Sequence, residues 1–313
     1  MSETTNKQSF LKSLIQSGIH FGHQTSRWCP KMARYIWGHK NNVHLIDVSK
    51  TALQLEKAGK FLESVASEGR CILWVGTKKP AQESIQAVAQ SLNMPYVTHR
   101  WIGGTLSNFS QVKKSVTNLL HDEDILAKAE KNSGDRQFHT KKEMVVLTKE
   151  YERLKKNVGG IRTLTWPVGA VVIIDVIKEH SALKEAVGMG VPVVALVDTN
   201  GDPSLVEYVI PGNDDSPRAI KLVLDYLAQA VKQGAEAAAI KAVARPEAIR
   251  LENESIDLSM MESETEGETD ENKAKAGRGK PEAAARLKRP KRPDFKKADD
   301  RGPRPAAPRK KDE

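Results

Sequence analysis

Short apolar runs alternate with amphipathic segments along the first 245 residues of the chain. The runs are rich in β-branched residues and cover residues 43–46, 71–75, 96–98, 171–174 and 191–197. Runs of this length and composition are typical of buried parallel strands. The segments between them carry helix start and stop signals, which predict helices over residues 9–17, 49–67, 80–91 and 181–187. This alternation predicts a doubly wound α/β fold with a parallel sheet.

One more helix is predicted after residue 215. Asp215 and Ser216 offer an N-cap, and Pro217 suits the first helical position. The apolar residues that follow fall on one helical stripe: Ile220, Val223, Leu224, Leu227 and Val231. This helix should therefore pack against the sheet.

An insertion at about residues 107–159 interrupts the alternation. Its apolar residues recur in steps of three and four on two arms, Val112, Val116 and Leu119 on the first, and Met144, Leu147, Tyr151, Leu154 and Val158 on the second. This period is that of a coiled-coil seam, so the insertion is predicted to be a protruding two-helix hairpin. A polar turn at 132–135 separates the arms, and Thr140 with Glu143 forms a capping box. The exposed lysines of the hairpin suit either a solvated face or phosphate contact: Lys113, Lys114, Lys141, Lys142, Lys149, Lys155 and Lys156.

The last 68 residues, 246–313, lack any apolar period. Residues 246–272 carry 10 acidic and 1 basic side chains, whereas residues 273–313 carry 16 basic and 6 acidic ones. Such a segment cannot bury enough apolar surface to offset its ordering entropy, so it is predicted to be a disordered tail. Residues 1–245 are then the folded domain. The tail could serve either as a solubilising segment or as an arm that grips RNA.

Composition and charge exclude several classes of protein. No stretch approaches the roughly 20 apolar residues of a membrane span, and the first ten residues lack the order of a signal peptide, so we expect a cytoplasmic protein. Cys29 and Cys71 form no CxxC motif, which argues for reduced thiols and against a zinc finger. The net charge of +9 favours a polyanionic partner.

The loops that nucleotide enzymes require are absent. The turn at residues 76–80, GTKKP, contains neither GxGxxG nor GxxxxGK[ST], and no GxSxG elbow occurs. We therefore expect no cofactor. Lys78 and Lys79 nevertheless stand where a strand end meets a helix N-terminus, which is either a generic phosphate site or an ordinary turn with surface lysines.

Two irregular segments combine glycines, aromatic rings and cations. Residues 18–37 contain two histidines, two tryptophans and three cations, and residues 99–109 repeat the theme in HRWIGGTLSNF. Aromatic and guanidinium planes stack on unpaired bases, while the charges meet phosphates, as in the recognition of folded RNA. His20 and His23 lack a third ligand nearby, so hydrogen-bonded loop packing is the simpler interpretation, and no metal is expected.

Carboxylates gather near the carboxyl ends of the later predicted strands. They are Asp175, Asp198, Asp214 and Asp215. They could form an acid/base pair or bind a hard cation, for instance near Asp198 and Asp214. Capping and turn formation explain them more economically.

Six ordered motifs carry a resemblance to a known family. GIHFGHQTSRWCPKM, VGTKK, HRWIGGTLSN, GGI, VDTNGDP and IPGNDDSPRA closely resemble segments of small-subunit ribosomal protein two (the RpsB family) of bacteria, over about residues 9–232. The resemblance implies a flavodoxin-like α/β domain with a protruding hairpin, seated on small-subunit ribosomal RNA and without catalytic activity. It also implies contacts with neighbouring ribosomal proteins and a dock for the large multi-OB-fold protein that captures messenger RNA.

The resemblance implies RNA-binding roles for His23, Gln24, Arg27, Trp28, Lys31, Lys78, Lys79, Arg100 and Trp101. Arg34, Gly103 and Gly104 lie in the same segments and complete the set of RNA-binding candidates. A nucleotide- or phosphate-ester-binding enzyme on the same fold would need a ligand loop that the sequence lacks. A coiled-coil adaptor that binds only proteins would leave residues 18–37 unexplained. We therefore expect a ribosome-bound structural protein with no small-molecule substrate, cofactor or membrane partner.

Overall fold

The computed structural model of the protein describes residues 2–131 and 140–239, which belong to one compact unit. Two of the sequence-based predictions lie outside the described residues, the polar turn at 132–135 and the disordered tail at 246–313. They stay predictions, as does the domain boundary at residue 245.

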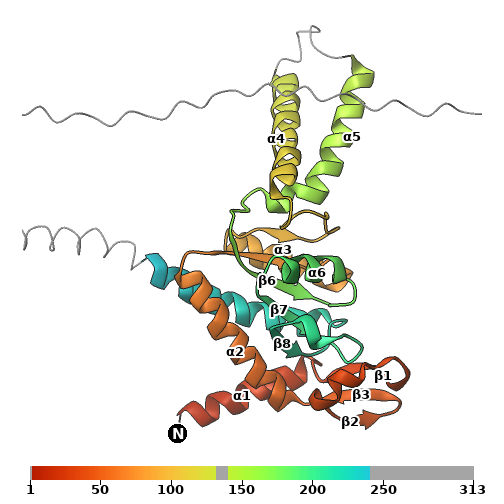
Figure 1. Cartoon of the computed structure of the whole chain (residues 1–313), viewed down its shortest axis with the longest axis vertical. Helices are drawn as coiled ribbons and strands as arrows, with labels where there is room; N and C mark the ends of the chain where they lie inside the picture. Colours follow the sequence, from red (N-terminus) through yellow and green to blue (C-terminus); the bar gives the residue numbers. More distant parts are fainter. Residues whose placement is uncertain (1, 132–139, 240–313) are drawn as a thin grey trace, which may run out of the picture. The chain divides into compact units, whose positions relative to one another are not determined.

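Five parallel strands form the central sheet (Figure 1). They are β4 (Cys71–Val75), β5 (Tyr96–Val97), β6 (Val168–Ile174), β7 (Val193–Val197) and β8 (Tyr208–Pro211). Their order across the sheet is β5-β4-β6-β7-β8, which is the order of flavodoxin-like doubly wound folds. The predicted α/β fold with a parallel sheet is confirmed.

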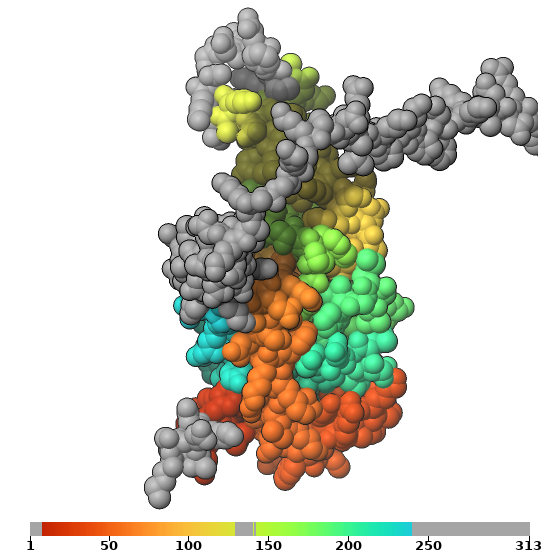
Figure 2. All heavy atoms as spheres, turned by 60° about the vertical axis from the view of Figure 1, so that its left-hand side comes forward, coloured from red at the N-terminus to blue at the C-terminus, as the bar shows by residue number. Residues whose placement is uncertain are grey.

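Both faces of this sheet are covered. Ile72 and Trp74 of β4 face a cluster formed with α2 (Val48–Ser67), α3 (Lys79–Ser91) and the helix over 217–239, whereas Leu73 and Val75 face α6 (His180–Gly188) and the base of the hairpin. Figure 2 shows α2, in orange, lying across one face of the molecule. Because both faces are buried, all seven residues of β6 are buried, which explains why the sequence shows continuous apolar runs.

The predicted helices are present among the described residues. Helix α1 spans Ser2–Gln16, and α2 ends at Ser67. Gly18 and Gly69 follow these helices with φ of +79° and +70°, a left-handed conformation that glycine adopts without steric cost. The helix over 217–239 packs its apolar stripe, from Ile220 to Val231, against the sheet, and the residues of this stripe are buried.

A second, smaller sheet is antiparallel. It contains β1 (Phe21–Gln24), β3 (Val43–Ile46) and β2 (Ile36–Lys40), in that order. Two short 3₁₀ helices, η1 (Thr25–Arg27) and η2 (Pro30–Tyr35), lie between β1 and β2. The prediction of a buried parallel strand at 43–46 was wrong. β3 pairs antiparallel with both neighbours, and Ile46 is its one fully buried residue. Asn41 and Asn42, both with positive φ, form the two-residue turn between β2 and β3.

The predicted hairpin consists of α4 (Phe109–Lys131) and α5 (Lys141–Val158), which lie side by side (Figure 1). Val112, Val116 and Leu119 of α4 are buried. The Thr140 and Glu143 capping box at the start of α5 is confirmed in both directions. The turn η3 (Gly159–Ile161) leads from α5 back towards the sheet and contacts β5.

Candidate nucleic-acid interface

The connection between β1 and β2 of the small sheet presents part of residues 18–37 to solvent. Arg27 and Arg34 are exposed, and the guanidinium of Arg34 lies 4.8 Å from the ring centroid of Tyr35. Trp28 is 39% exposed, and its ring lies 5.3 Å from that of His44. Exposed arginines can meet the phosphates of RNA, and the part-exposed ring of Trp28 can stack on a base.

Backbone contacts fix this segment to the carboxyl end of β7. The Cys29 amide donates to the Thr199 carbonyl at 2.8 Å, and the His23 amide donates to the Thr199 hydroxyl at 2.9 Å. A Cβ on Gly22 would lie 2.8 Å from that same hydroxyl oxygen. Glycine is therefore required there by close packing, and the segment is held in a defined position instead of moving as a free loop.

His23 is engaged with carboxylates. Its Nδ1 lies 2.7 Å from Oδ2 of Asp198, and its Nε2 lies 3.5 Å from Oδ2 of Asp215. The hydrogen bond with buried Asp198 raises the pKa of His23 above its ordinary value, although burial opposes the shift. The ring therefore bridges the small sheet and the carboxyl end of the central sheet.

Lys78 lies in the same cluster. Its ammonium nitrogen is 2.6 Å from Asp215, 2.8 Å from Asp214 and 3.5 Å from Asp175, and its side chain is only 17% exposed. Burial disfavours its charge, yet hydrogen bonds to Asp214 and Asp215 raise the pKa of Lys78 overall. We name the set of Lys78, His23, Asp175, Asp198, Asp214 and Asp215 the internal charge network.

Asp214 is the most buried carboxylate that contacts Lys78. Burial raises the pKa of Asp214 to about 6, and the nearby charges of Asp175 and Asp198 add to this in spite of the hydrogen bond from Lys78. The network thus holds more negative than positive charge. Replacing His23 or Lys78 with a neutral residue should therefore lower the stability of the fold.

Four members of the network could hold a divalent cation. One ligand atom each from His23, Asp198, Asp214 and Asp215 lies within 4.8 Å of the others. A histidine nitrogen and carboxylate oxygens are ligands that zinc and harder cations accept. The sequence alone offered no third ligand beside His20 and His23. The fold supplies the carboxylates from the ends of β7 and β8.

The turn after β4 is occupied by the protein's own groups. The Thr77 amide donates to Oε1 of the buried Glu179 at 2.7 Å, and Lys178 donates to the Thr77 carbonyl at 3.1 Å. Helix α3 starts at Lys79, which is exposed. A phosphate would have to displace these partners, so this turn does not resemble an open nucleotide site.

Lys31 pairs with Asp202, the residue before the turn η4 (Pro203–Leu205). The two charged groups are 2.7 Å apart and both more than half exposed. The hydrogen bond from Lys31 lowers the pKa of Asp202 to about 2. Such an exposed pair adds little stability, so Lys31 could exchange Asp202 for a phosphate at small cost.

Glu185 on α6 organises the HRWIGG segment. Its carboxylate accepts hydrogen bonds from Trp101 Nε1 at 2.9 Å and from the backbone amides of Gly104, Leu106 and Ser107 at 2.8–3.2 Å. Trp101 is 8% exposed, so its ring packs inward. Gly104 has a φ of +94°, which favours glycine. Arg100 and Gly103 are both exposed, and a Cβ added to Gly103 would meet no other atom within 4 Å.

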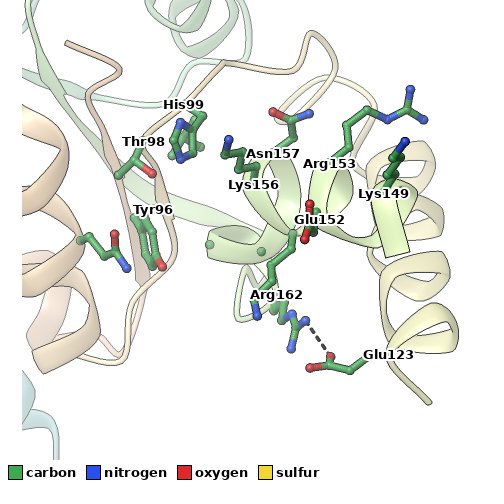
Figure 3. Close-up of a pocket in the computed structure, with 15 residues that line it drawn as sticks. Tyr96, Thr98, His99, Glu123, Lys149, Glu152, Arg153, Lys156, Asn157 and Arg162 are labelled. Carbon is green, nitrogen blue, oxygen red and sulfur yellow. Dashed lines mark hydrogen bonds and ion pairs between the residues drawn. The ribbon is translucent and has the colours of Figure 1, made fainter. Parts of the chain in front are cut away.

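A basic cavity lies at the base of the hairpin, and we name it the hairpin groove (Figure 3). It has a volume of about 950 Å³ and lies between α5, the end of β5 and the η3 turn. Five cations and two carboxylates line it: Lys149, Arg153, Lys155, Lys156, Arg162, Glu123 and Glu152. Sequence reasoning singled out three of these lysines as hairpin surface residues but did not identify Arg153 or Arg162 as candidates.

Comparison with known protein families identifies the chain. Residues 14–234 match the family model described as ribosomal protein S2. The chain belongs to the ribosomal protein S2 family. Members of this family are structural proteins of the small ribosomal subunit, so the role is in translation and is not enzymatic. The resemblance stated from the sequence motifs is thereby confirmed.

Membership in the S2 family defines the partners in general terms, as ribosomal RNA and ribosomal proteins. No helix within residues 2–131 and 140–239 is long and apolar enough to span a bilayer. Of the residues predicted to contact RNA, the structure brings His23 and Lys78 together through Asp215, whereas Trp101 and Gly104 are held separately by Glu185.

Proposed function

We propose that this ribosomal protein contacts small-subunit ribosomal RNA through the predicted cations that remain open to solvent. They are Arg27 and Arg34 in the connection between β1 and β2, Lys79 at the start of α3 and Arg100 before the hairpin, with Gln24 and Trp28 in the same segment as the first two. The observation that carries the proposal is the rigid presentation of Arg27, Trp28 and Arg34 on a segment pinned to Thr199. A rigid mount lowers the ordering cost of binding.

The other residues predicted to bind RNA position the segments that carry these exposed cations. His23 and Lys78 tie the small sheet to the central sheet, and both contact the carboxylate of Asp215. Trp101 and Gly104 shape the segment that presents Arg100, and Gly103 leaves room for a close approach of RNA backbone. Lys31 can contribute to either role, because its pair with Asp202 is exposed.

The proposal also includes docking of the messenger-RNA-capturing multi-OB-fold protein on the small sheet. Trp37 of β2 is 76% exposed and Phe21 of β1 is 49% exposed. Exposed aromatic side chains of this size are enriched in protein interfaces. On a protein that works on cytoplasmic ribosomes, as we expect here, such residues suit a protein neighbour at the edge of the RNA contact.

The RNA contact is tested with the double variant Arg27→Ala, Arg34→Ala. Its binding to small-subunit ribosomal RNA should show a salt slope smaller by about one unit for each phosphate that the variant no longer engages. The matched control is Lys57→Ala, Lys221→Ala, which removes two exposed lysines from other helices. Equal slopes for the two variants would show that Arg27 and Arg34 only face solvent.

Docking is tested by exchanging Trp37 for alanine. Small subunits that carry the Trp37→Ala protein should retain less of the multi-OB-fold protein through sedimentation, while ribosomal RNA binding is unchanged. Leu53→Ala removes a comparably exposed apolar side chain (59%) from α2 and serves as the control. Full retention by the Trp37 variant would place the dock elsewhere.

A further inference from the structure

The hairpin groove contains cations that form no ion pair with residues 2–131 and 140–239. Lys149, Arg153 and Lys156 are exposed, and none of the ion pairs within the described part of the chain includes them. They are four and three residues apart on α5, so they form one stripe that rises about 10 Å along the helix. On a convex surface, a stripe of exposed cations would be explained by contact with solvent alone. These three cations instead line a cavity, which can hold a ligand.

The opposite wall comes from the sheet. Figure 3 shows Lys149 and Arg153 on one side of the cavity, and Tyr96 of β5 with Thr98 and His99, which follow this strand, on the other. Gly160 of η3 packs directly on β5, because a Cβ at this position would collide with the Tyr96 carbonyl and ring. The spacing between the two walls is therefore fixed by close packing.

Hydrogen bonds also connect the elements that surround the groove. Arg162 donates to Oε2 of Glu123 at 2.7 Å, and the Tyr151 hydroxyl donates to Oε1 of the same carboxylate at 3.3 Å. These bonds tie α4, α5 and the segment after η3 to one another. The cavity is thus preformed, and ligand binding does not include the cost of assembling it.

The geometry points to the hairpin groove as a binding site for the phosphate backbone of ribosomal RNA, separate from residues 18–37. This inference rests on the proposed RNA-binding function and extends it to a surface that the sequence motifs did not include. Five cations against two carboxylates favour a polyanion. The carboxylate of Glu123 is already satisfied by Arg162 and Tyr151, so its charge opposes a phosphate less than a free one would.

Arginine and lysine side chains spread over a preformed concave wall suit a chain of phosphates better than a single small anion. A small anion would engage one or two of the donors, whereas successive phosphates can engage the whole stripe. RNA is also recognised largely through its shape and backbone, and cations on the wall of a groove suit contacts with that backbone.

The test compares two triple variants of the full chain in binding to ribosomal RNA extracted from small subunits. The groove variant is Lys149→Ala, Arg153→Ala, Lys156→Ala. The control is Lys57→Ala, Lys221→Ala, Lys232→Ala, which removes the same charge from exposed positions of α2 and of the helix over 217–239 that do not line the groove. Near physiological salt the groove variant should bind roughly fourfold more weakly for each phosphate that it no longer engages, with a correspondingly smaller salt slope.

A second variant, in which a negative charge is removed, should strengthen RNA binding and so separates an effect on binding from a loss of folded protein. Glu152 lines the groove and is exposed, so it repels phosphates there. Glu152→Gln should tighten RNA binding by a few-fold, which a merely destabilised protein would not do. Equal affinity and slope for the two triple variants, or no effect of Glu152→Gln, would overturn the inference.

The outcomes separate this inference from the proposed function. If the wild-type chain fails to bind ribosomal RNA at all, the proposed function fails. If Arg27→Ala, Arg34→Ala weakens binding and the groove variant does not, the function stands and the groove inference is wrong. If the groove variant keeps its RNA affinity but assembled subunits lose a neighbouring protein, the occupant is a protein, and the inference is again overturned.

Discussion

The internal charge network and the hairpin groove contain similar cations and use them in opposite ways. In the network, Lys78 lies within 3.5 Å of three carboxylates and is mostly buried. In the groove, Lys149, Arg153 and Lys156 are exposed and have no ion-pair partner among the described residues. A lysine in an RNA-binding protein is therefore not by itself an RNA ligand. Its burial and its carboxylate neighbours decide whether it supports the fold or remains available for a phosphate.

The largest effect is expected from removing the network's lysine. Lys78→Ala leaves the buried Asp214 and the nearby Asp175 without their cation, and breaking a buried pair in this way costs about 3 kcal/mol. For a domain of this size, the melting temperature should fall by roughly 6–12 °C. Chemical denaturation and calorimetry in the presence of a chelator would measure the change without a bound cation compensating for it.

The adjacent lysine provides the control. Lys79 is exposed, so Lys79→Ala should change the unfolding free energy by no more than about 0.5 kcal/mol. If the two variants unfold alike, Lys78 does not hold the network together, and the distinction between the two regions fails.

The fold was predictable where the physical signal is local. The branched apolar runs of β4, β6 and β7 and the capping box of α5 identify their elements without reference to the rest of the chain. The strand β3 was misassigned because a four-residue apolar run does not reveal whether its neighbours are parallel or antiparallel. β8 was missed because Tyr208–Pro211 is short and ends in a proline, which is an unusual strand residue.

The candidate site was less predictable because its contacts join distant parts of the chain. The gathering of Asp198 and Asp214 was visible in the sequence, since the carboxyl ends of parallel strands meet at one edge. Their pairing with His23 and Lys78 spans 175 and 136 residues and depends on how the small sheet packs. Glu185 gave no signal at all, because an acidic residue in an amphipathic helix resembles a solvated one.

The second prediction acts on the scaffold of the hairpin groove. Gly160→Ala places a methyl group against the Tyr96 carbonyl and ring, and the backbone must shift to accommodate it. Overpacking of this kind costs about 2 kcal/mol and should also weaken RNA binding by separating the two walls. Equilibrium unfolding and the RNA-binding assay on the same protein would measure both consequences.

The neighbouring glycine makes a matched comparison. Gly159 has helical dihedral angles, and its nearest atom, Cγ of Lys155, would be 3.7 Å from an added Cβ. Gly159→Ala should therefore leave the protein unchanged or stabilise it by about 0.5 kcal/mol. Equal losses for both substitutions would mean that the close contact with β5 does not define the groove.

The smallest effect is expected at Glu185, whose carboxylate accepts hydrogen bonds from neutral donors and has no ion-pair partner within residues 2–131 and 140–239. Although burial alone would raise it, the pKa of Glu185 is lowered by hydrogen bonds from Ser107, Trp101 and Leu106. Glu185→Gln keeps the shape but weakens these charge-assisted bonds, and should cost about 1.5 kcal/mol at neutral pH. Chemical denaturation of both proteins across a pH series would measure the difference.

The direction of the pH dependence tests whether the charge of Glu185 contributes to stability. A carboxylate whose pKa is lower in the folded state than in the unfolded state stabilises the protein fully above the unfolded-state value, and this contribution is lost as the pH falls through the folded-state value. The difference between wild type and Glu185→Gln should therefore be constant near neutrality and shrink in acid below the ordinary pKa of 4.5. A difference that does not depend on pH would show that the Glu185 charge is irrelevant and that only its shape holds Trp101 in place.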